Sequence, residues 1–110
     1  MITRGATADL DRAFAALAHP VRRQILESTA RKGRGVTELT EAFDISLAAV
    51  SKHVKVLERA GLVSREIMGR DHVIRARVEE LRAARQWIER QTTFWERAMA
   101  RLKADLEQKP

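Results

Sequence analysis

Apolar residues recur with helical spacing in the first thirty residues. The first stripe consists of Leu10, Phe14 and Leu17, and the second of Val21, Ile25 and Leu26. Spacings of three and four place such residues on one face of a helix. Pro20 suits the first turn of the second helix, where a missing N–H costs nothing. We therefore predict a short helix from about Asp9, a second from Pro20 to about Ala30, and a flexible arm over residues 1–8, which lack a periodic apolar face.

The strongest helical period lies in the middle of the chain. It consists of Leu47, Val50, Val54 and Leu57, all of which we expect in the core. Ser46 can cap this helix and Gly61 can end it. A shorter apolar pattern at Leu39, Ala42 and Phe43 predicts a preceding helix, which Thr37 can cap. The segment 44–46 between the two helices has the composition of a tight turn.

The periodicity changes after Gly61. Residues 62–68 and 72–76 are β-tolerant runs on either side of Gly69, Arg70 and Asp71, which predicts a hairpin. From Val78 to about Lys109 no Gly or Pro interrupts a helix-forming stretch, which at about 1.5 Å per residue is about 50 Å long. A heptad stripe of Leu81, Ile88, Trp95 and Leu102 runs along it. This pattern is typical of helices that pack along their length.

Two short helices joined by a three-residue turn and followed by a glycine-tipped hairpin form the element order of a winged helix-turn-helix. We predict a mainly α fold with a small β-hairpin (α+β), in which four helices, two strands and a last helix follow one another. Residues 9–110 are expected to form one DNA-binding and dimerisation domain.

Composition narrows the function. The chain has 110 residues, 45% hydrophobic and 33% charged, with a net charge of +6, which favours a polyanionic partner such as nucleic acid. It contains no cysteine, so it can form neither a disulfide nor a thiolate metal site. The longest purely apolar run has six residues. We therefore expect a cytoplasmic protein with no signal peptide and no membrane span.

The candidate DNA-binding residues lie on the helix after the turn and at the hairpin tip. Such a helix meets base edges in the major groove with its N-terminal, outward side chains. Serines can donate hydrogen bonds, alanines permit close approach, and lysines supply charge for phosphates. An arginine at the tip can reach the adjacent minor groove. The set is Ser46, Ala48, Ala49, Ser51, Lys52, His53, Lys55 and Arg70.

Two segments resemble the ArsR-type family of bacterial repressors. One is residues 36–63, with the run Ser-x-x-x-Val-Ser-x-His from Ser46 and the later Ala-Gly-Leu-Val, followed by Gly69-Arg70. The other is residues 17–26, Leu-Ala-His-Pro-Val-Arg-Arg-Gln-Ile-Leu. The resemblance spans about Asp9 to Leu106. It implies a sequence-specific transcriptional regulator, a homodimeric repressor of its own or neighbouring genes, that binds double-stranded, palindromic operator DNA.

The same resemblance bears on metal sensing. Metal-sensing members place cysteines on the third helix or histidine and carboxylate pairs on the last, but residues 37–42 hold no thiol and residues 78–110 hold no histidine. The chain thus resembles a subgroup without cysteine sensor sites, often encoded beside genes for small proteins that bind hydrophobic ligands. We expect no metal site and no cofactor, and the identity of any effector stays open.

A dimer interface is expected on the first and last helices. Its candidate residues are Leu10, Phe14, Leu17, Leu81, Trp87, Ile88, Phe94, Trp95 and Leu102. Pairing about a two-fold axis would present two recognition helices about 34 Å apart, one turn of DNA. A hydrophobic effector bound along the aromatic stripe is the alternative interpretation of Trp87, Phe94 and Trp95.

Other interpretations concern the histidines and the function class. His19 is expected to have a local capping or packing role, and His53 either contacts DNA or bonds to a neighbouring carbonyl. His72 on the hairpin is expected to face solvent or phosphate. No Ser, His and acid set and no glycine-rich phosphate loop indicates an enzyme. A winged-helix protein-interaction module and a sequence-nonspecific DNA-binding protein remain as alternatives.

Overall fold

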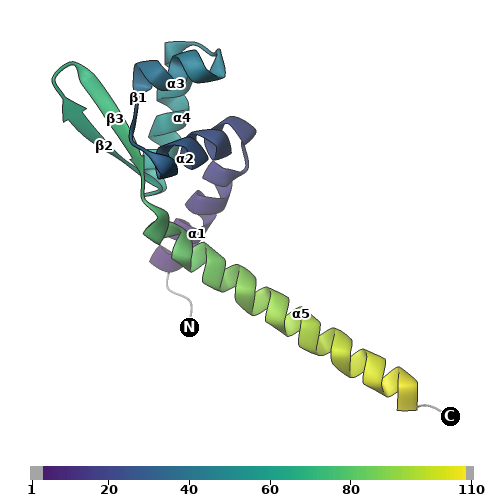
Figure 1. Ribbon diagram of the computed structural model, residues 1–110. Coiled ribbons are helices and arrows are strands. Elements are labelled where there is room, and N and C mark those ends of the chain that lie inside the picture. Colours follow the sequence, from purple (N-terminus) through teal and green to yellow (C-terminus); the bar gives the residue numbers. More distant parts are fainter. Residues whose placement is uncertain (1–3, 109–110) are drawn as a thin grey trace.

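The computed structural model describes residues 4–108, which form five α-helices, a 3₁₀ turn and a small sheet (Figure 1). The N-terminal half contains α1 (Arg4–Leu17), α2 (Pro20–Arg31), β1 (Arg34–Gly35), α3 (Val36–Phe43) and α4 (Leu47–Arg59). The C-terminal half contains β2 (Val63–Met68), β3 (Asp71–Ala76), the 3₁₀ turn η1 (Val78–Leu81) and α5 (Arg82–Gln108). This order confirms the expected winged helix-turn-helix and adds β1 and η1.

The first helix begins earlier than expected. Helix α1 begins at Arg4 rather than near Asp9, so residues 4–8 are helical and that part of the flexible-arm prediction is wrong. Ala6 and Ala8 favour helix, and Gly5 costs only about 1 kcal/mol relative to alanine. A helix can thus continue past its apolar stripe. The rest of the expected arm, residues 1–3, lies outside the described residues.

The helix ends follow the expected capping chemistry at two of three places. Pro20 lies in the first turn of α2, and the Ser46 Oγ accepts a hydrogen bond from the Ala49 amide at 3.1 Å. The expected cap at Thr37 is wrong, because α3 already begins at Val36 with Gly35 before it. Gly35 is extended there because it pairs with Val73 of β3. The helix therefore begins where this short strand ends.

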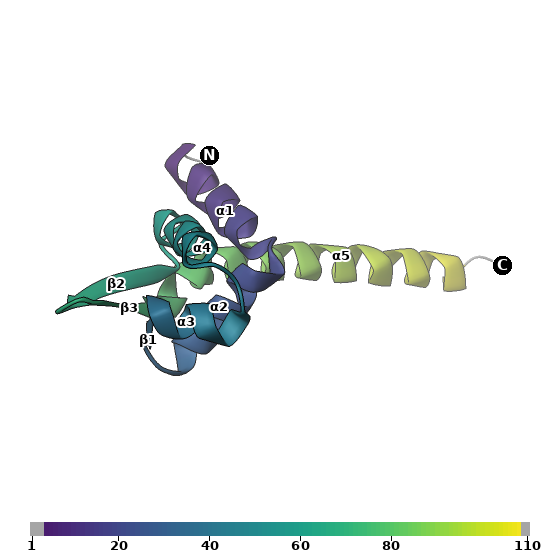
Figure 2. The same ribbon diagram turned by 90° about the horizontal axis from the view of Figure 1, so that it is seen from above.

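The sheet is antiparallel, with strand order β1-β3-β2. Its β2–β3 hairpin is the predicted wing, closed by a two-residue turn in which Gly69 has φ +65°, a conformation that favours glycine. The third strand was not predicted, because two residues leave no periodic signal. Figures 1 and 2 show the wing and α5 extending from opposite sides of the helical body.

The core lies where α2, α3 and α4 meet the sheet. Its largest fully buried side chains are Ile25, Leu39, Val50, Val54, Leu57, Leu62 and Ile74. Three members of the central stripe are thus confirmed as core. Leu47 is not, because it stands in the first turn of α4, beyond the end of the core, and is 57% exposed.

Helix α5 projects from the body. It has 27 residues, about 40 Å at the usual rise, and begins after η1 rather than directly at Val78. The radius of gyration is 19.3 Å, against about 13 Å for a compact domain of this length. Among residues 4–108, most of α5 therefore has no neighbouring element (Figure 1). No helix among residues 4–108 is long and apolar enough to cross a membrane.

Candidate nucleic-acid interface

The outer face of α4 is polar and exposed. Ala48, Lys52 and Lys55 are exposed, and so is Arg59, which follows at the same helical spacing. The opposite face of the helix is buried in the core through Val50, Val54 and Leu57. The core thus fixes which way α4 faces, and the two lysines point away from the body.

The start of α4 carries the smallest side chains of the candidate set. Ser46 is exposed, and because its Oγ already accepts from the Ala49 amide, its own O–H is left to donate. Ala49 and Ser51 are half-buried at the two borders of the outer face. Leu47 is exposed beside them, so an apolar group is available for contact with thymine methyl groups. The sequence pattern missed this residue because its spacing matches the core stripe.

His53 borders the core and lies against other side chains of its own chain. Its ring packs on His19, with centroids 4.5 Å apart and planes at 51°. Its Nδ1 lies 3.4 Å from the Nη1 of Arg22, and because arginine only donates, Nδ1 accepts. Burial, and then the charges of His19, Arg22 and Lys52, lower the pKa of His53. The lowered pKa favours the neutral imidazole at neutral pH. The hydrogen-bond partner of the ring is the Arg22 side chain, and not the backbone carbonyl considered from the sequence.

His19 has the local role expected of it. It is the N-cap residue of α2, and its Nδ1 accepts a hydrogen bond from the Val21 amide at 3.2 Å. The capping bond turns its ring toward α4. The beginning of α2 is therefore in contact with α4 through two tilted imidazole rings.

The wing is tied to the end of α4 by an ion pair. Arg65 of β2 donates to both carboxylate oxygens of Glu58, at 2.7 and 3.3 Å, and its Nη1 lies 2.8 Å from the His72 Nδ1. His72 was expected to face solvent or phosphate; it is half-buried, and its Nδ1 meets Arg65 because residues 65 and 72 project from the same face of the hairpin. Arg70 at the tip is exposed. A bidentate pair of this kind fixes the wing's direction, and with it the position of Arg70.

The candidate dimer residues divide into two groups. Leu17 and Leu81 are half-buried against the chain's own core. Phe14 contacts Trp87 edge-on, with centroids 5.7 Å apart, so α1 and α5 meet within the chain, and Leu10 is half-buried. The second group lies farther along α5 and is exposed to between 48% and 62%: Ile88, Phe94, Trp95 and Leu102, with Met99 and Leu106.

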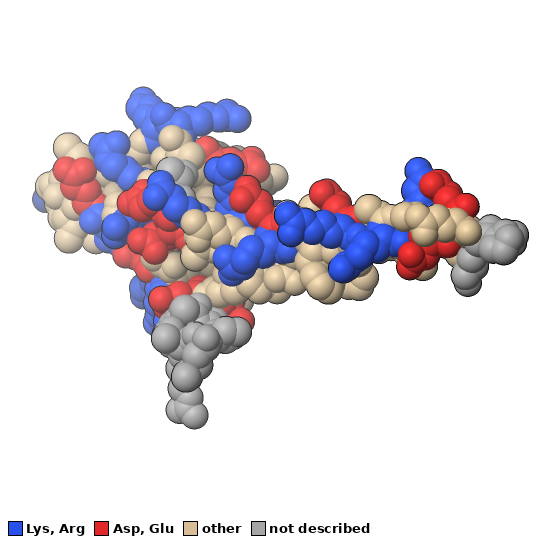
Figure 3. All heavy atoms as spheres, turned by 90° about the horizontal axis from the view of Figure 1, so that it is seen from below, with Lys and Arg blue, Asp and Glu red and all other residues tan. Residues whose placement is uncertain are grey.

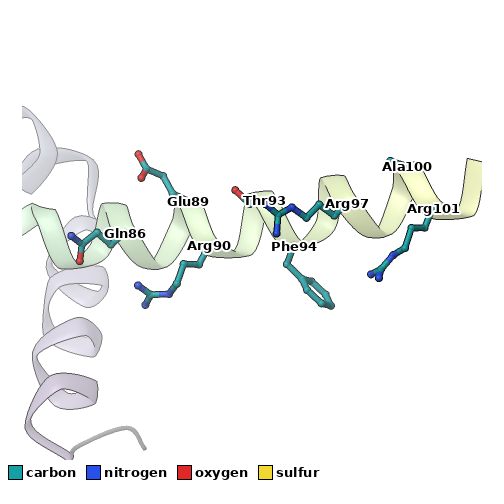
Figure 4. Close-up of a pocket in the computed structure, with 8 residues that line it drawn as sticks. All are labelled: Gln86, Glu89, Arg90, Thr93, Phe94, Arg97, Ala100 and Arg101. Atoms are coloured by element: carbon teal, nitrogen blue, oxygen red, sulfur yellow. The ribbon is translucent and has the colours of Figure 1, made fainter.

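A second stripe on α5 is basic. Arg90, Arg97 and Arg101 flank Phe94 along a groove on the helix surface, and Figure 4 shows these side chains projecting from α5 alone. Figure 3 shows basic side chains following α5 beside uncharged ones. Within residues 4–108 these three arginines form no ion pair. Within the described residues 4–108 no second element closes the groove, so a ligand held there would need a wall from another molecule.

The described residues offer no group for metal chemistry. Within residues 4–108, no three His, Cys, Asp or Glu side chains lie close enough together to hold a metal ion. One carboxylate near this surface, that of Glu58, is paired with Arg65.

Besides Leu47, two residues near this surface could not be predicted from the sequence. Arg22 lies in α2 yet reaches α4, and Arg65 lies in β2 yet reaches the end of α4. Both contacts join residues of different elements, so no periodicity within one element could reveal them. The only local feature that could have indicated a role for Arg22 is its place in the first turn of α2, three residues after the N-cap His19.

A family model described as a helix-turn-helix domain matches residues 17–66. The HTH-type transcriptional regulator Rv2034 of Mycobacterium tuberculosis is 39% identical over 89 residues, which cover 81% of this chain and 80% of that protein. The match includes the helix-turn-helix and extends well beyond it.

Two solved structures are similar over most of their length. An ArsR-like transcriptional regulator from Rhodococcus sp. RHA1 has a TM-score of 0.84 and 31% identity, covering 99% of this chain and all of that one. The homodimeric winged helix-turn-helix DNA-binding domain of Mb0332 from Mycobacterium bovis, a possible ArsR-family regulator, has a TM-score of 0.65 and 28% identity, covering 87% and 89%.

Proposed function

The chain belongs to the ArsR family of winged helix-turn-helix, DNA-binding transcriptional regulators, and we propose that it acts as a homodimeric repressor of its own or neighbouring genes. The observation that carries the proposal is the exposed outer face of α4, where Lys52 and Lys55 follow a stretch of small side chains. A helix of this kind fits the major groove, since its charges meet phosphates while its short side chains leave room for base edges.

The candidate residues have distinct roles in this proposal. Lys52 and Lys55 bind phosphates and set the register of α4, whereas Ser46, Ala48, Ala49 and Ser51 lie nearest the base edges. Arg70 enters the minor groove next to the site, where A·T tracts concentrate negative potential. His53 is the member with least freedom to contact DNA, because its Nδ1 already accepts from Arg22.

Helix α5 supports the dimer. Ile88, Trp95, Met99, Leu102 and Leu106 share one face of α5, whereas Phe94 lies on the side of the basic groove. Within residues 4–108, α1 and η1 pack against the first turns of this helix, so a monomer would leave the rest of that apolar face in water. We propose that α1 and α5 of two protomers pair about a two-fold axis; the similar domain from Mycobacterium bovis, which is homodimeric, supports the dimer. Two recognition helices about 34 Å apart then require a palindromic operator.

Titration of the protein on its own upstream promoter fragment tests the function. At about 150 mM salt the promoter should bind at least a thousandfold more tightly than a scrambled duplex of equal length, about the lower limit for specific regulators. A ratio near one would favour sequence-nonspecific binding. No binding to either duplex would favour a protein-interaction module.

Repression itself needs a separate measurement. A reporter gene behind the same promoter should be expressed less when the protein is present than when it is absent, because a dimer on the promoter excludes other proteins from that DNA. Higher expression in the presence of the protein would make it an activator.

A further inference from the structure

The C-terminus of α1, the beginning of α2 and the middle of α4 meet at one side chain. Arg22 donates from Nε to the Ala16 carbonyl at 2.8 Å and from Nη2 to the Ala15 carbonyl at 3.0 Å. Its Nη1 faces the Nδ1 of His53 at 3.4 Å. All three nitrogens of the guanidinium are thus engaged within the chain, and they join two helices to a third.

The two carbonyls that Arg22 binds belong to the last turn of α1. Carbonyls there have no partner within their own helix, and a cation beside them also stabilises the negative end of the helix dipole. Arg23 does the same for the Leu17 carbonyl at 2.6 Å, but within residues 4–108 no hydrogen bond joins its side chain to α4. Both arginines therefore bind carbonyls at the end of α1, and Arg22 in addition forms a hydrogen bond with His53 of α4.

We propose that Arg22 is a positioning residue for DNA binding, which holds the recognition helix against α1 through a hydrogen bond to neutral His53. The proposal rests on the proposed function, because it assumes that α4 meets DNA. The contacts of Arg22 with α1 also connect to the proposed dimer helices, since Phe14 of α1 contacts Trp87 of α5. One set of contacts thus runs from the dimer helices to the face that reads the operator.

The hydrogen bond exists in only one protonation state of His53. A protonated ring carries an N–H at Nδ1, which would face the donor Nη1 of Arg22 instead of accepting from it. The titratable and charged groups that face the ring are His19 and Arg22 from the beginning of α2, and Lys52 from α4 itself. None of these is an acid that would stabilise the charged imidazole. Protonation of His53 therefore replaces this attraction by repulsion from Arg22 and weakens the connection between α4 and α1.

The direction of the pH effect follows. Because burial and the facing groups lower the pKa of His53, the bond is intact at neutral pH and is lost only as the pH falls below about 6.5, the ordinary value for the ring. DNA affinity should then fall at least twofold between about pH 8 and about pH 5. Added positive charge alone would raise the affinity instead.

The test uses the full chain and the labelled upstream promoter duplex. Arg22→Gln should weaken binding roughly three- to tenfold, the range expected for one hydrogen bond, and the slope of affinity against salt should stay unchanged. Arg22→Lys should bind the promoter no more tightly than Arg22→Gln, since a lysine restores the charge but cannot reach three acceptors. The matched control is Arg23→Gln, which removes an equal charge and a similar carbonyl contact and should bind within about twofold of the wild type.

A second variant does not depend on the stability of the first. In His53→Asn the side-chain oxygen can accept from Arg22 at any pH, so the ratio between its affinities at high and low pH should be close to one. Thermal unfolding of every variant establishes that each is folded under the binding conditions.

Three results would overturn the proposal: folded Arg22→Gln protein that binds as the wild type does, a salt slope lowered by about one and restored by Arg22→Lys, or His53→Asn protein that keeps the wild-type pH profile. The second result would make Arg22 a direct phosphate contact. Failure of the proposed function looks different, because the wild type would then bind the promoter no better than scrambled DNA at any pH.

Discussion

Leu102→Asp should break the dimer while leaving the winged body folded. Leu102 is 51% exposed in the single chain and lies on the apolar stripe of α5. It forms no part of the chain's own core. A charge placed there is harmless in a monomer, but between two paired helices it is removed from water.

The size of the effect can be worked from the exposed fraction. Full burial of a leucine contributes roughly 2 kcal/mol, so covering its exposed half contributes about 1 kcal/mol per protomer. Burial of an unpaired carboxylate at the edge of an interface costs at least about 2 kcal/mol more. Both protomers change by symmetry, which gives about 6 kcal/mol per dimer. At 1.4 kcal/mol per tenfold, the dimer should dissociate at concentrations about ten thousandfold higher.

Sedimentation velocity over a range of concentrations measures this shift. The matched control is Thr93→Asp, since Thr93 is exposed and lies nine residues before Leu102, half a turn round the helix. The control should dimerise as the wild type does, and both variants should keep the wild-type circular dichroism spectrum. Leu102→Asp protein that remains dimeric at wild-type concentrations would refute the reasoning about α5.

Three further changes test other parts of the account. Lys52→Ala should weaken promoter binding and lower the slope of log affinity against log salt by about one, whereas a merely solvated lysine would leave the slope unchanged in a fluorescence-anisotropy titration. Ser46→Ala should lower the free energy of unfolding by about 1 kcal/mol in urea denaturation and Ser46→Gly by only a few tenths, because glycine tolerates the cap position; equal losses would contradict the capping role. Arg70→Ala should weaken binding more when A·T pairs flank the operator than when G·C pairs do, and equal losses would place Arg70 outside the minor groove.

The elements of the fold were predictable wherever a periodic apolar stripe exists. The stripe through Val50, Val54 and Leu57 identified α4 and its buried face, and the change of period after Gly61 identified the wing. Local chemistry identified the Ser46 cap. These signals lie within single segments, so the sequence alone carries them.

The structure differs from the expectations drawn from the sequence where one segment of the chain depends on another. Strand β1 exists because Gly35 pairs with Val73, 38 residues farther along the chain, and that pairing also moves the start of α3. Leu47 matches the core spacing, but the body does not extend far enough to cover it. Helix α1 begins early because nothing in residues 4–8 ends a helix, even without an apolar face.

The candidate site was predictable in its outline but not in its internal contacts. Helical spacing put Lys52 and Lys55 on the outer face of α4, as the structure does. The bonds of Arg22 to His53 and of Arg65 to Glu58 and His72 join residues from separate elements. Such contacts depend on the packing of the folded chain, and a single sequence has no pattern for them.

A hydroxyl-radical footprint of the wild-type protein on its own promoter tests the central claim most directly. Two protected tracts are expected on each strand, related by a two-fold axis and separated by about 10 base pairs, because each protomer of the dimer presents one α4 to the major groove. Protection without this symmetry, or none above that seen on scrambled DNA, would contradict the claim that two recognition helices read an operator.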